Sequence, residues 1–318
     1  MSFDRTGSDV LNSYVVISQG RNEAEYMLNT LDSMVKQTIL PSLWVIVDDG
    51  STDDTADILA DYARRYDFIR VVTRQNRGHR SVGPGVIEAF YEGLDTVDLK
   101  EFDYLCKLDL DLIMPPRYFE TLMERMAGNP RLGNCSGKPY YIDKTSGAFV
   151  SEGCGDENAI GVSKFYRREC FEEIGGFVRQ VMWDGIDGHR CRQLGWIAMS
   201  WDEPDIRFTH LRPMGSSQQS IITGRVRHGL GQYFMGTGVV YMLASGLYRM
   251  TRPPLLVGGL AMMWGYVKSW LTGVPRFDDK ELASFIRKYQ WACLLKGKKR
   301  ATEELNDKQS TLWADKNT

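Results

Sequence analysis

The sequence has little net charge, no closely spaced cysteine pair and no apolar segment at its N-terminus. Its 39 Lys and Arg residues nearly balance 41 Asp and Glu residues, whereas a nucleic-acid partner would favour a basic surplus. Its six cysteines show no C-x-x-C spacing, so we interpret them as reduced core residues. Residues 1–13 are polar and mixed in charge, unlike a secretory signal, and we expect the catalytic part to stay in the cytosol.

Long uninterrupted apolar runs are also missing, although two glycine-rich segments come close. Residues 230–248 hold no charged residue and residues 253–274 hold only Lys268, but several glycines interrupt both. A membrane span needs about 20 apolar residues, yet the glycines favour interfacial or re-entrant helices. The basic and aromatic stretch at residues 276–300 suits an anionic membrane surface. The alternative is a buried helix pair followed by a solvated basic helix.

The first half of the chain alternates short β-branched runs with longer helical patterns. We expect strands at residues 14–18, 44–47, 69–73 and 104–108, and helices at about 23–36, 55–66, 85–95 and 117–126. This order predicts an α/β fold with a parallel sheet, in which ligands bind beyond the carboxyl ends of the strands. From about residue 129 to residue 205 the pattern becomes irregular, which predicts a mixed sheet and loops of the acceptor site.

Two carboxylates, Asp109 and Asp111, stand two residues apart directly after the apolar strand 104–108. Side chains at that spacing in an extended chain point the same way, so their charges repel unless a cation lies between them. A hard divalent ion such as Mg²⁺ or Mn²⁺ prefers oxygen ligands and would bridge to a substrate diphosphate. The alternative is a pair of solvated loop acids, which is common at this spacing.

A second acidic pair, Asp48 and Asp49, follows the apolar strand 44–47 and precedes Gly50. A turn and a helix cap would account for Gly50 and the polar residues after it, but not for the pair itself. An Asp at the carboxyl end of such a strand is well placed to accept hydrogen bonds from a nucleobase N–H or a ribose hydroxyl.

A third acidic motif holds Asp184 and Asp187, just before a short helical stretch. Both could be acids that the positive end of a helix stabilises. The functional interpretation makes one of them a general base, because an acceptor hydroxyl must lose its proton as it attacks.

Basic residues gather at 76–80 and 207–212, and Arg225 and Arg227 follow. Guanidinium groups match the oxygens of a diphosphate, so we expect some of these residues near one. His210 lies in the second cluster and could be a further metal ligand, although a lone histidine is more often structural.

Taken in order, these motifs resemble those of the family 2 glycosyltransferases of the GT-A fold, over about residues 14–210. Residues 15–23, V-V-I-S-Q-G-R-N-E, look like the family's first strand and its Asn-Glu turn. Residues 47–53, V-D-D-G-S-T-D, are nearly its commonest nucleotide motif, and residues 76–78 match its N-x-G element. Residues 109–111 match its metal-binding D-x-D.

The resemblance implies a Rossmann-like mixed sheet flanked by helices and a nucleotide-diphosphate sugar donor, with a UDP-sugar favoured. It assigns the divalent metal, Mg²⁺ or Mn²⁺, to Asp109 and Asp111, with His210 as a further ligand. The donor contacts that it implies are Asn22, Asp48, Asp49, Arg80 and Asp109. Alignment through Arg190 puts Asp184 at the catalytic base and leaves Asp187 as a competitor.

The chain departs from the family's pattern at several places. Trp183 precedes Asp184 where the family usually has an acid pair, and Gln19 stands where Pro is common. The Q-x-x-R-W motif and the clear transmembrane helices of processive synthases are missing, so long-chain synthesis and export are not expected. Residues 249–290 resemble the membrane-attached extension of some bacterial polysaccharide-assembly members.

We therefore expect an inverting, metal-dependent hexosyltransferase that acts on a hydroxyl of a polyprenyl-diphosphate-linked acceptor in polysaccharide or glycan assembly. It would lie at the cytoplasmic face of a bacterial inner membrane, monotopic or peripheral, and could form oligomers. The expected parts are a catalytic domain (1–228), a membrane-associated helical region (229–300) and a polar tail (301–318). The alternatives are an enzyme that transfers sugar to polyprenyl phosphate and an inactive nucleotide-sugar-binding scaffold.

Overall fold

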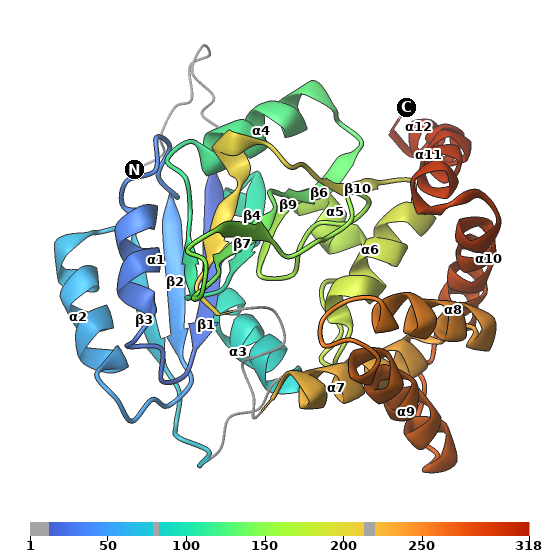
Figure 1. The fold of residues 1–318 in the computed structure, drawn as a ribbon. Helices are drawn as coiled ribbons and strands as arrows, with labels where there is room; N and C mark the ends of the chain where they lie inside the picture. The colour runs from blue at the N-terminus through green and yellow to red at the C-terminus, as the bar shows by residue number, and fades with distance from the viewer. Residues whose placement is uncertain (1–12, 79–82, 213–219, 318) are drawn as a thin grey trace.

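A mixed seven-stranded sheet forms the centre of the computed structural model, which describes residues 13–78, 83–212 and 220–317. The strand order is β10-β6-β9-β4-β1-β2-β3. The strands are β1 (Tyr14–Gly20), β2 (Leu43–Asp48), β3 (Ile69–Thr73), β4 (Tyr104–Leu108), β6 (Leu132–Ser136), β9 (Ser163–Arg167) and β10 (Ile197–Ser200). Helices flank this sheet (Figure 1), and the predicted α/β fold is confirmed.

The four strands predicted in the first half are present, and they run parallel to one another. The helices between and after them are α1 (Met27–Met34), α2 (Thr55–Arg65), α3 (Pro84–Leu94) and α4 (Tyr118–Gly128). Alternate residues of β1 point to opposite faces: Tyr14 and Val16 pack with α1, α2 and α4, whereas Val15 and Ile17 pack with α3. Both faces of β1, β2 and β4 are buried, which explains their largely apolar sequences, whereas β3 is an edge strand with Arg70 and Thr73 exposed.

Helix α1 begins at Met27 rather than at residue 23, where the sequence pattern places its start. Asn22 has a left-handed backbone with a φ of 55°. The next backbone N–H, that of Glu23, donates to Oγ1 of Thr55 at 2.9 Å. The segment before α1 is therefore tied to the first residue of α2 instead of continuing the helix.

The irregular second half forms a mixed sheet, as predicted, because β9 runs antiparallel between β4 and β6. A smaller sheet has the order β5-β11-β7-β8 and consists of β5 (Leu112–Ile113), β11 (Phe208–His210), β7 (Pro139–Ile142) and β8 (Phe149–Ser151). His210 pairs with Leu112 in this sheet. That pairing brings the end of β11 next to the D-x-D motif.

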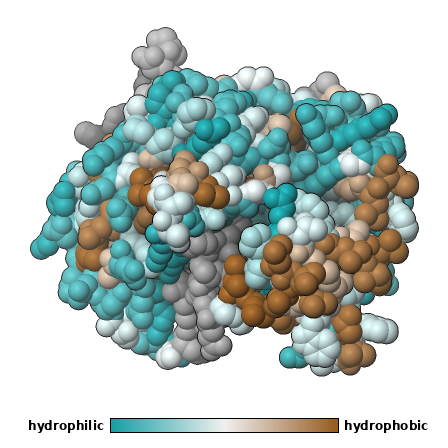
Figure 2. All heavy atoms as spheres, in the orientation of Figure 1, coloured by the Kyte–Doolittle hydropathy of each residue, from teal (hydrophilic) through white to brown (hydrophobic). Residues whose placement is uncertain are grey.

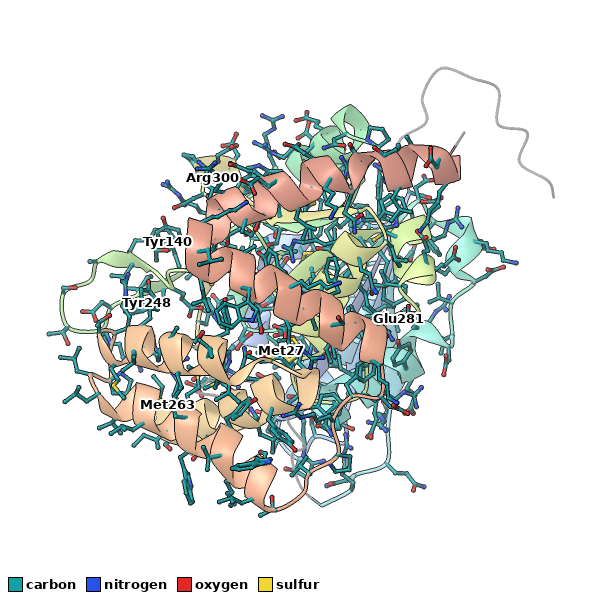
Figure 3. The ribbon with its side chains drawn as sticks, turned by 90° about the vertical axis from the view of Figure 1, so that its right-hand side faces the viewer. Met27, Tyr140, Tyr248, Met263, Glu281 and Arg300 are labelled. Carbon is teal, nitrogen blue, oxygen red and sulfur yellow. The ribbon has the colours of Figure 1, made fainter. Side chains whose placement is uncertain are left out.

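Helices make up nearly all of the chain after residue 220 and lie to one side of the main sheet (Figures 1 and 3). They are α7 (Ile221–Met235), α8 (Val239–Met250), α9 (Val257–Leu271), α10 (Lys280–Lys296), α11 (Lys298–Lys308) and α12 (Ser310–Asn317). Among the described residues, none of the helices has the length and apolar character needed to cross a bilayer. The polar tail is helical, and its Trp313 packs edge-on against Trp196.

Glycines let α9 approach α7 closely. A Cβ atom on Gly265 would lie 2.0 Å from the carbonyl oxygen of Val226, and one on Gly229 would lie 1.9 Å from that of Met262. The two backbones are therefore in direct contact. Small residues at helix crossings are a packing device common between membrane helices.

We expect the Gly265→Ala variant to unfold at a lower temperature. The added methyl group would force the backbones of α7 and α9 apart, and such overpacking costs about 1–3 kcal/mol. Thermal unfolding followed by circular dichroism measures the effect. Gly128→Ala is the matched control, since a Cβ atom there meets nothing within 4 Å. Equal midpoints for the two variants would contradict the packing described here.

Candidate active site

A cavity of about 630 Å³ lies where the carboxyl ends of β1 and β4 meet the C-terminal helices. The sheet side contributes Gln19, Lys107, Asp109 and Asp111. The opposite wall comes from the helices, with Arg227, His228 and Gln232 from α7, Tyr241 from α8, Tyr289 from α10 and Lys298 from α11. The expected boundary at residue 228 falls within α7, in this wall.

Asp109 lies just beyond β4, and its side chain is 27% exposed. Its Oδ1 accepts hydrogen bonds from Nε2 of Gln19 at 2.9 Å and from Nζ of Lys107. The Lys107 ammonium is buried and also donates to the carbonyl oxygen of Gly161 at 3.1 Å. This lysine offsets part of the repulsion between the two acids of the D-x-D motif, a role that sequence reasoning did not identify.

Asp111 is buried, and the two oxygens of its carboxylate differ. Oδ2 lies 2.8 Å from Nε of Arg212 and 3.7 Å from Nε2 of His210. Oδ1 is buried and has no hydrogen-bond partner among the described residues. A buried polar atom without a partner is costly, so Oδ1 is an acceptor site that a ligand could fill.

His210 connects Asp111 to a second carboxylate, because its Nδ1 lies 3.1 Å from Oε1 of Glu152. Burial alone would lower the pKa of His210, but the two carboxylates outweigh burial and raise the pKa to about 9. Burial would raise the pKa of Asp111, whereas His210 and Arg212 together lower it to about 2. At neutral pH these residues are therefore charged, and they hold one another in place.

The three predicted metal ligands line the same cavity. Within the described part of the chain, no group of three or more His, Cys, Asp or Glu side chains is arranged to hold a metal ion by itself. The open Oδ1 of Asp111 and the accessible Asp109 are hard oxygen donors, with His210 beside them. This set fits Mg²⁺ or Mn²⁺ if a diphosphate supplies further ligands.

Asp184 and Asp187 lie on α6 (Trp183–Gln193) in different surroundings. Asp184 lines the cavity, whereas Asp187 is 1% exposed and lies outside its lining. The two oxygens of Asp187 accept hydrogen bonds from Nζ of Lys164 at 2.5 Å and from the hydroxyl of Tyr166. Burial raises the pKa of Asp187. The geometry therefore brings Asp184 together with the D-x-D motif and leaves Asp187 in the core.

The predicted nucleoside residues lie outside the lining of this cavity. Asp49 is ion-paired through one oxygen with Arg74, at 2.7 Å, and through the other with Arg77. Oδ1 of Asp48 and Oδ1 of Asn22 accept hydrogen bonds from the backbone N–H groups of residues 51 and 52, at 2.9 and 2.8 Å. Arg80 lies outside the described residues. In this structure the acidic pair and Asn22 hold two neighbouring loops together.

Two histidines that sequence reasoning did not select also line the cavity. His228 lies 3.2 Å from the side-chain nitrogen of Gln232, and the ring of His189 packs edge-on against Tyr289. Burial, reinforced by nearby cationic side chains, lowers the pKa of His189 to about 3 and that of His228 to about 4. Both rings are neutral at physiological pH. No spacing rule could have joined them, because they come from different helices.

The sequence profile of the family described as glycosyl transferase family 2 matches residues 16–180, more than half of the 318 residues. The chain belongs to glycosyl transferase family 2. The resemblance seen in the motifs is thereby confirmed. The segment that matches family 2 includes Asp48, Asp49, Asp109 and Asp111, whereas Asp184 and the helical wall of the cavity lie beyond it.

Curated relatives of this family 2 protein include bacterial polysaccharide synthases. The poly-β-1,6-N-acetyl-D-glucosamine synthase of Staphylococcus epidermidis RP62A is 30% identical over 126 residues, which are 39% of this chain and 28% of that synthase. The synthase of the same name from Staphylococcus aureus COL is 29% identical over 126 residues. The match spans less than a third of the length of either relative.

Solved structures share the fold at low sequence identity. GalNAc-T7, in a complex with UDP, GalNAc and Mn²⁺, superposes with a TM-score of 0.57 and 15% identity, over 85% of this chain and 56% of that one. TarS of S. aureus superposes with a TM-score of 0.50 and 12% identity, over 95% of this chain and 55% of that one. A central mixed sheet flanked by helices, the GT-A fold expected from the motifs, is confirmed.

Proposed function

We propose that this family 2 protein transfers a sugar from a nucleotide-diphosphate sugar to a hydroxyl of a lipid-linked acceptor, with inversion at the anomeric carbon. The observation that carries the proposal is that Asp109, Asp111 and Asp184, from two distant motifs, line one cavity. The similarity to GalNAc-T7, which binds UDP and Mn²⁺, supports a UDP-sugar and a divalent metal. The synthase relatives support a role in polysaccharide assembly.

In the proposed mechanism Asp184 accepts the proton of the acceptor hydroxyl while the hydroxyl oxygen attacks the anomeric carbon. The bond from that carbon to the diphosphate breaks in the same step, so the nucleoside diphosphate leaves and the configuration inverts. Asp109 and Asp111 would hold Mg²⁺ or Mn²⁺, with His210 as a further ligand after its ring has given up a proton, and the ion would supply Lewis-acid stabilisation of the leaving diphosphate. Arg212, beside Asp111, adds a fixed positive charge near the same group.

The nucleoside is proposed to contact Asp48 and Asp49, with Asn22 in the adjoining turn and Arg80 toward the diphosphate. A base or ribose that binds Asp49 would take one of the positions that Arg74 and Arg77 occupy on its carboxylate. The displaced guanidinium would then be available to the diphosphate oxygens.

The direct test is nucleoside diphosphate release from a panel of nucleotide sugars, with membrane lipid extract as the acceptor. We expect release from one donor in Mg²⁺ or Mn²⁺, a fall to background in EDTA and recovery when the metal is restored. Full activity in EDTA would refute the metal assignment. Release of inorganic diphosphate would indicate a nucleotidyltransferase, and no release from any donor would support the scaffold alternative.

Helix α9 carries its large apolar side chains on the side away from the protein. Leu260, Trp264, Val267 and Leu271 recur at helical spacing and are 40% to 67% exposed, whereas Gly265 faces α7. A helix in water normally shows the reverse arrangement. The exposed residues Val239, Leu243 and Leu247 of α8 and Leu255 and Leu256 of the turn extend this apolar face. Figure 2 shows apolar side chains gathered over these helices.

We propose that the apolar face, formed by α8, the turn before α9 and α9, rests on a lipid bilayer. An exposed patch of this kind marks an interaction site. Cationic side chains belong to the same helices and their flanks: Arg252, Lys268 and Arg276. They complement the anionic cytoplasmic leaflet. The proposed location is the cytoplasmic face of the bacterial inner membrane, with monotopic or peripheral attachment.

Vesicle flotation tests this attachment. We expect the Trp264→Ser/Leu271→Ser double variant to bind phosphatidylcholine–phosphatidylglycerol vesicles more than tenfold more weakly, since burying each large apolar side chain contributes about 1.5–3 kcal/mol. Leu28→Ser is the matched control, because Leu28 is 46% exposed on α1, outside the apolar face. Unchanged flotation of the double variant would contradict the proposal.

A further inference from the structure

Two arginines of the helical region have buried atoms without partners. Arg225 lies in the second turn of α7 and Arg249 in the last turn of α8. The Nε atoms of both are buried and have no hydrogen-bond partner within the described ranges. Nη2 of Arg249 donates to the carbonyl oxygen of Pro253 at 2.6 Å. Among the described residues, neither guanidinium has a carboxylate within 4.0 Å.

The charges of this arginine pair are only partly compensated. Burial lowers the pKa of Arg225, and the positive charge of Arg249 lowers it further. The carboxylate of Glu152 acts in the opposite direction, but it already pairs with His210 at 3.1 Å. Burial and the charge of Arg252 lower the pKa of Arg249. Two adjoining half-buried cations with buried, unpartnered Nε atoms are costly unless an anion joins them.

The arginine pair lies between the cavity and the apolar face. Arg225 is one helical turn before His228, which lines the cavity and whose pKa is lowered by burial and by the charges of Arg225 and Arg249. Toward the apolar face, Arg249 lies close to the first turn of α9. A Cβ atom added to Gly258 there would lie 3.7 Å from Nε of Arg249. Figure 3 shows α8 and α9 side by side, with Tyr248 labelled on α8 next to Arg249 in the sequence.

We propose that Arg225 and Arg249 bind the phosphate or diphosphate group that joins the acceptor sugar to its lipid. The proposal rests on the proposed function, which supplies the lipid-linked acceptor. Guanidinium groups form charge-assisted, forked hydrogen bonds with phosphate oxygens, and the unpartnered Nε atoms are donors for such bonds. A phosphate held there would have its sugar toward Asp184 in the cavity and its lipid chain toward the exposed leucines of α8 and the turn before α9.

A direct binding measurement tests the site without catalysis. The probe is inorganic diphosphate, added to the full-length protein in EDTA so that no metal is bound, with the thermal unfolding midpoint as readout. We expect diphosphate to raise the midpoint of the wild type and not of Arg225→Gln/Arg249→Gln. The Arg225→Lys/Arg249→Lys variant keeps the charges and should keep part of the rise. An equal rise in the wild type and the Gln variant would overturn the proposal.

Kinetics then identify the source of the phosphate. With polyprenyl-diphosphate-linked acceptor in phosphatidylcholine vesicles, the Gln variant should raise the KM for acceptor tenfold or more and leave the KM for the donor within threefold. A rise in the donor KM alone would assign the pair to the donor and overturn the proposal. The proposal would also be overturned if the Gln variant lost only its binding to acceptor-free phosphatidylglycerol vesicles. That result would indicate a general phospholipid contact.

Arg64→Gln is the control, because Arg64 is a 76% exposed cation on α2, outside the helical region. The two proposals also fail separately. If the wild type transfers sugar to no lipid-linked acceptor, the proposed function fails, while the diphosphate-induced rise in midpoint still reports on the arginine pair.

Discussion

The Asp109→Asn variant is expected to release nucleoside diphosphate about a thousandfold more slowly than the wild type at saturating donor and metal. The carboxylate is a proposed metal ligand, and Lewis-acid stabilisation of the leaving group is worth several kcal/mol, at about 1.4 kcal/mol for each factor of ten. Asn keeps the size of the side chain, and its amide oxygen can still accept the hydrogen bond from Gln19. Initial rates at several Mn²⁺ concentrations measure the loss.

Mn²⁺ binding to the same variant, measured by calorimetry with the nucleoside diphosphate present, separates metal loss from general damage. We expect the affinity for Mn²⁺ to fall together with the rate. Asp202→Asn is a suitable control, because Asp202 pairs with Arg207 at the surface, 2.6 Å away, and lies outside the cavity lining. If Asp109→Asn bound Mn²⁺ with unchanged affinity and kept the full rate, the assignment of Asp109 as a metal ligand would be contradicted.

Replacing Asp184 by Asn is expected to lower kcat by about 10²–10⁴-fold, the range that general-base catalysis contributes. The side chain keeps its shape but can no longer take the acceptor proton. The KM for the donor should stay within about threefold, because Asp184 has no assigned donor contact. Steady-state kinetics with a lipid-linked sugar acceptor measure both parameters.

Asp187, the second acid of the Asp184 motif, is expected to affect stability instead of catalysis. Asp187→Asn removes the charge that pairs with Lys164 in the core, so we expect it to lower the unfolding temperature, an effect that Asp184→Asn should lack. Asp57→Asn, on the exposed surface of α2, controls for the loss of a charge. If Asp184→Asn kept full activity on a polyprenyl phosphate acceptor, the alternative reaction would gain support, because a phosphate nucleophile needs no base.

The sequence predicted the elements whose signals are local. The strands around Tyr14, Trp44 and Tyr104 are apolar because both of their faces are buried, and the edge strand around Ile69 is β-branched. Neither pattern needs knowledge of the rest of the chain. The signal of the D-x-D motif was equally local, because the motif comes directly after β4 in the sequence. Parallel topology then placed the loop motifs at one end of the sheet.

The parts that the sequence could not predict depend on contacts between distant segments. The environment of Asp187 comes from Lys164 and Tyr166 on β9, a strand that joins the sheet in the antiparallel direction. Asp49 forms ion pairs with Arg74 and Arg77, which follow β3 in the sequence. The prediction that Asp49 is free to contact a nucleoside did not include these ion pairs. No spacing rule relates such positions, since tertiary packing alone brings them together.

The helical wall of the cavity was the part of the site that sequence patterns predicted least well. Tyr241 and Tyr289 line the cavity, but the composition of their segments suggested membrane contact, or else a buried helix pair and a solvated basic helix. Tyr289 reaches the cavity through tertiary packing, edge-on against His189 of α6. The crossing of α7 and α9 at Gly229 and Gly265 likewise depends on shape rather than on hydrophobicity. Glycines that interrupt an apolar segment therefore indicated close helix contact as well as poor membrane spans.

The helices that line the cavity belong to the same packed group as those that carry the apolar face. The reaction centre would therefore sit at a set height above any surface on which that face rests. An acceptor anchored in that surface reaches Asp184 only with sugars at that distance from its lipid end. Transfer would then depend on how far the acceptor hydroxyl stands from its lipid end.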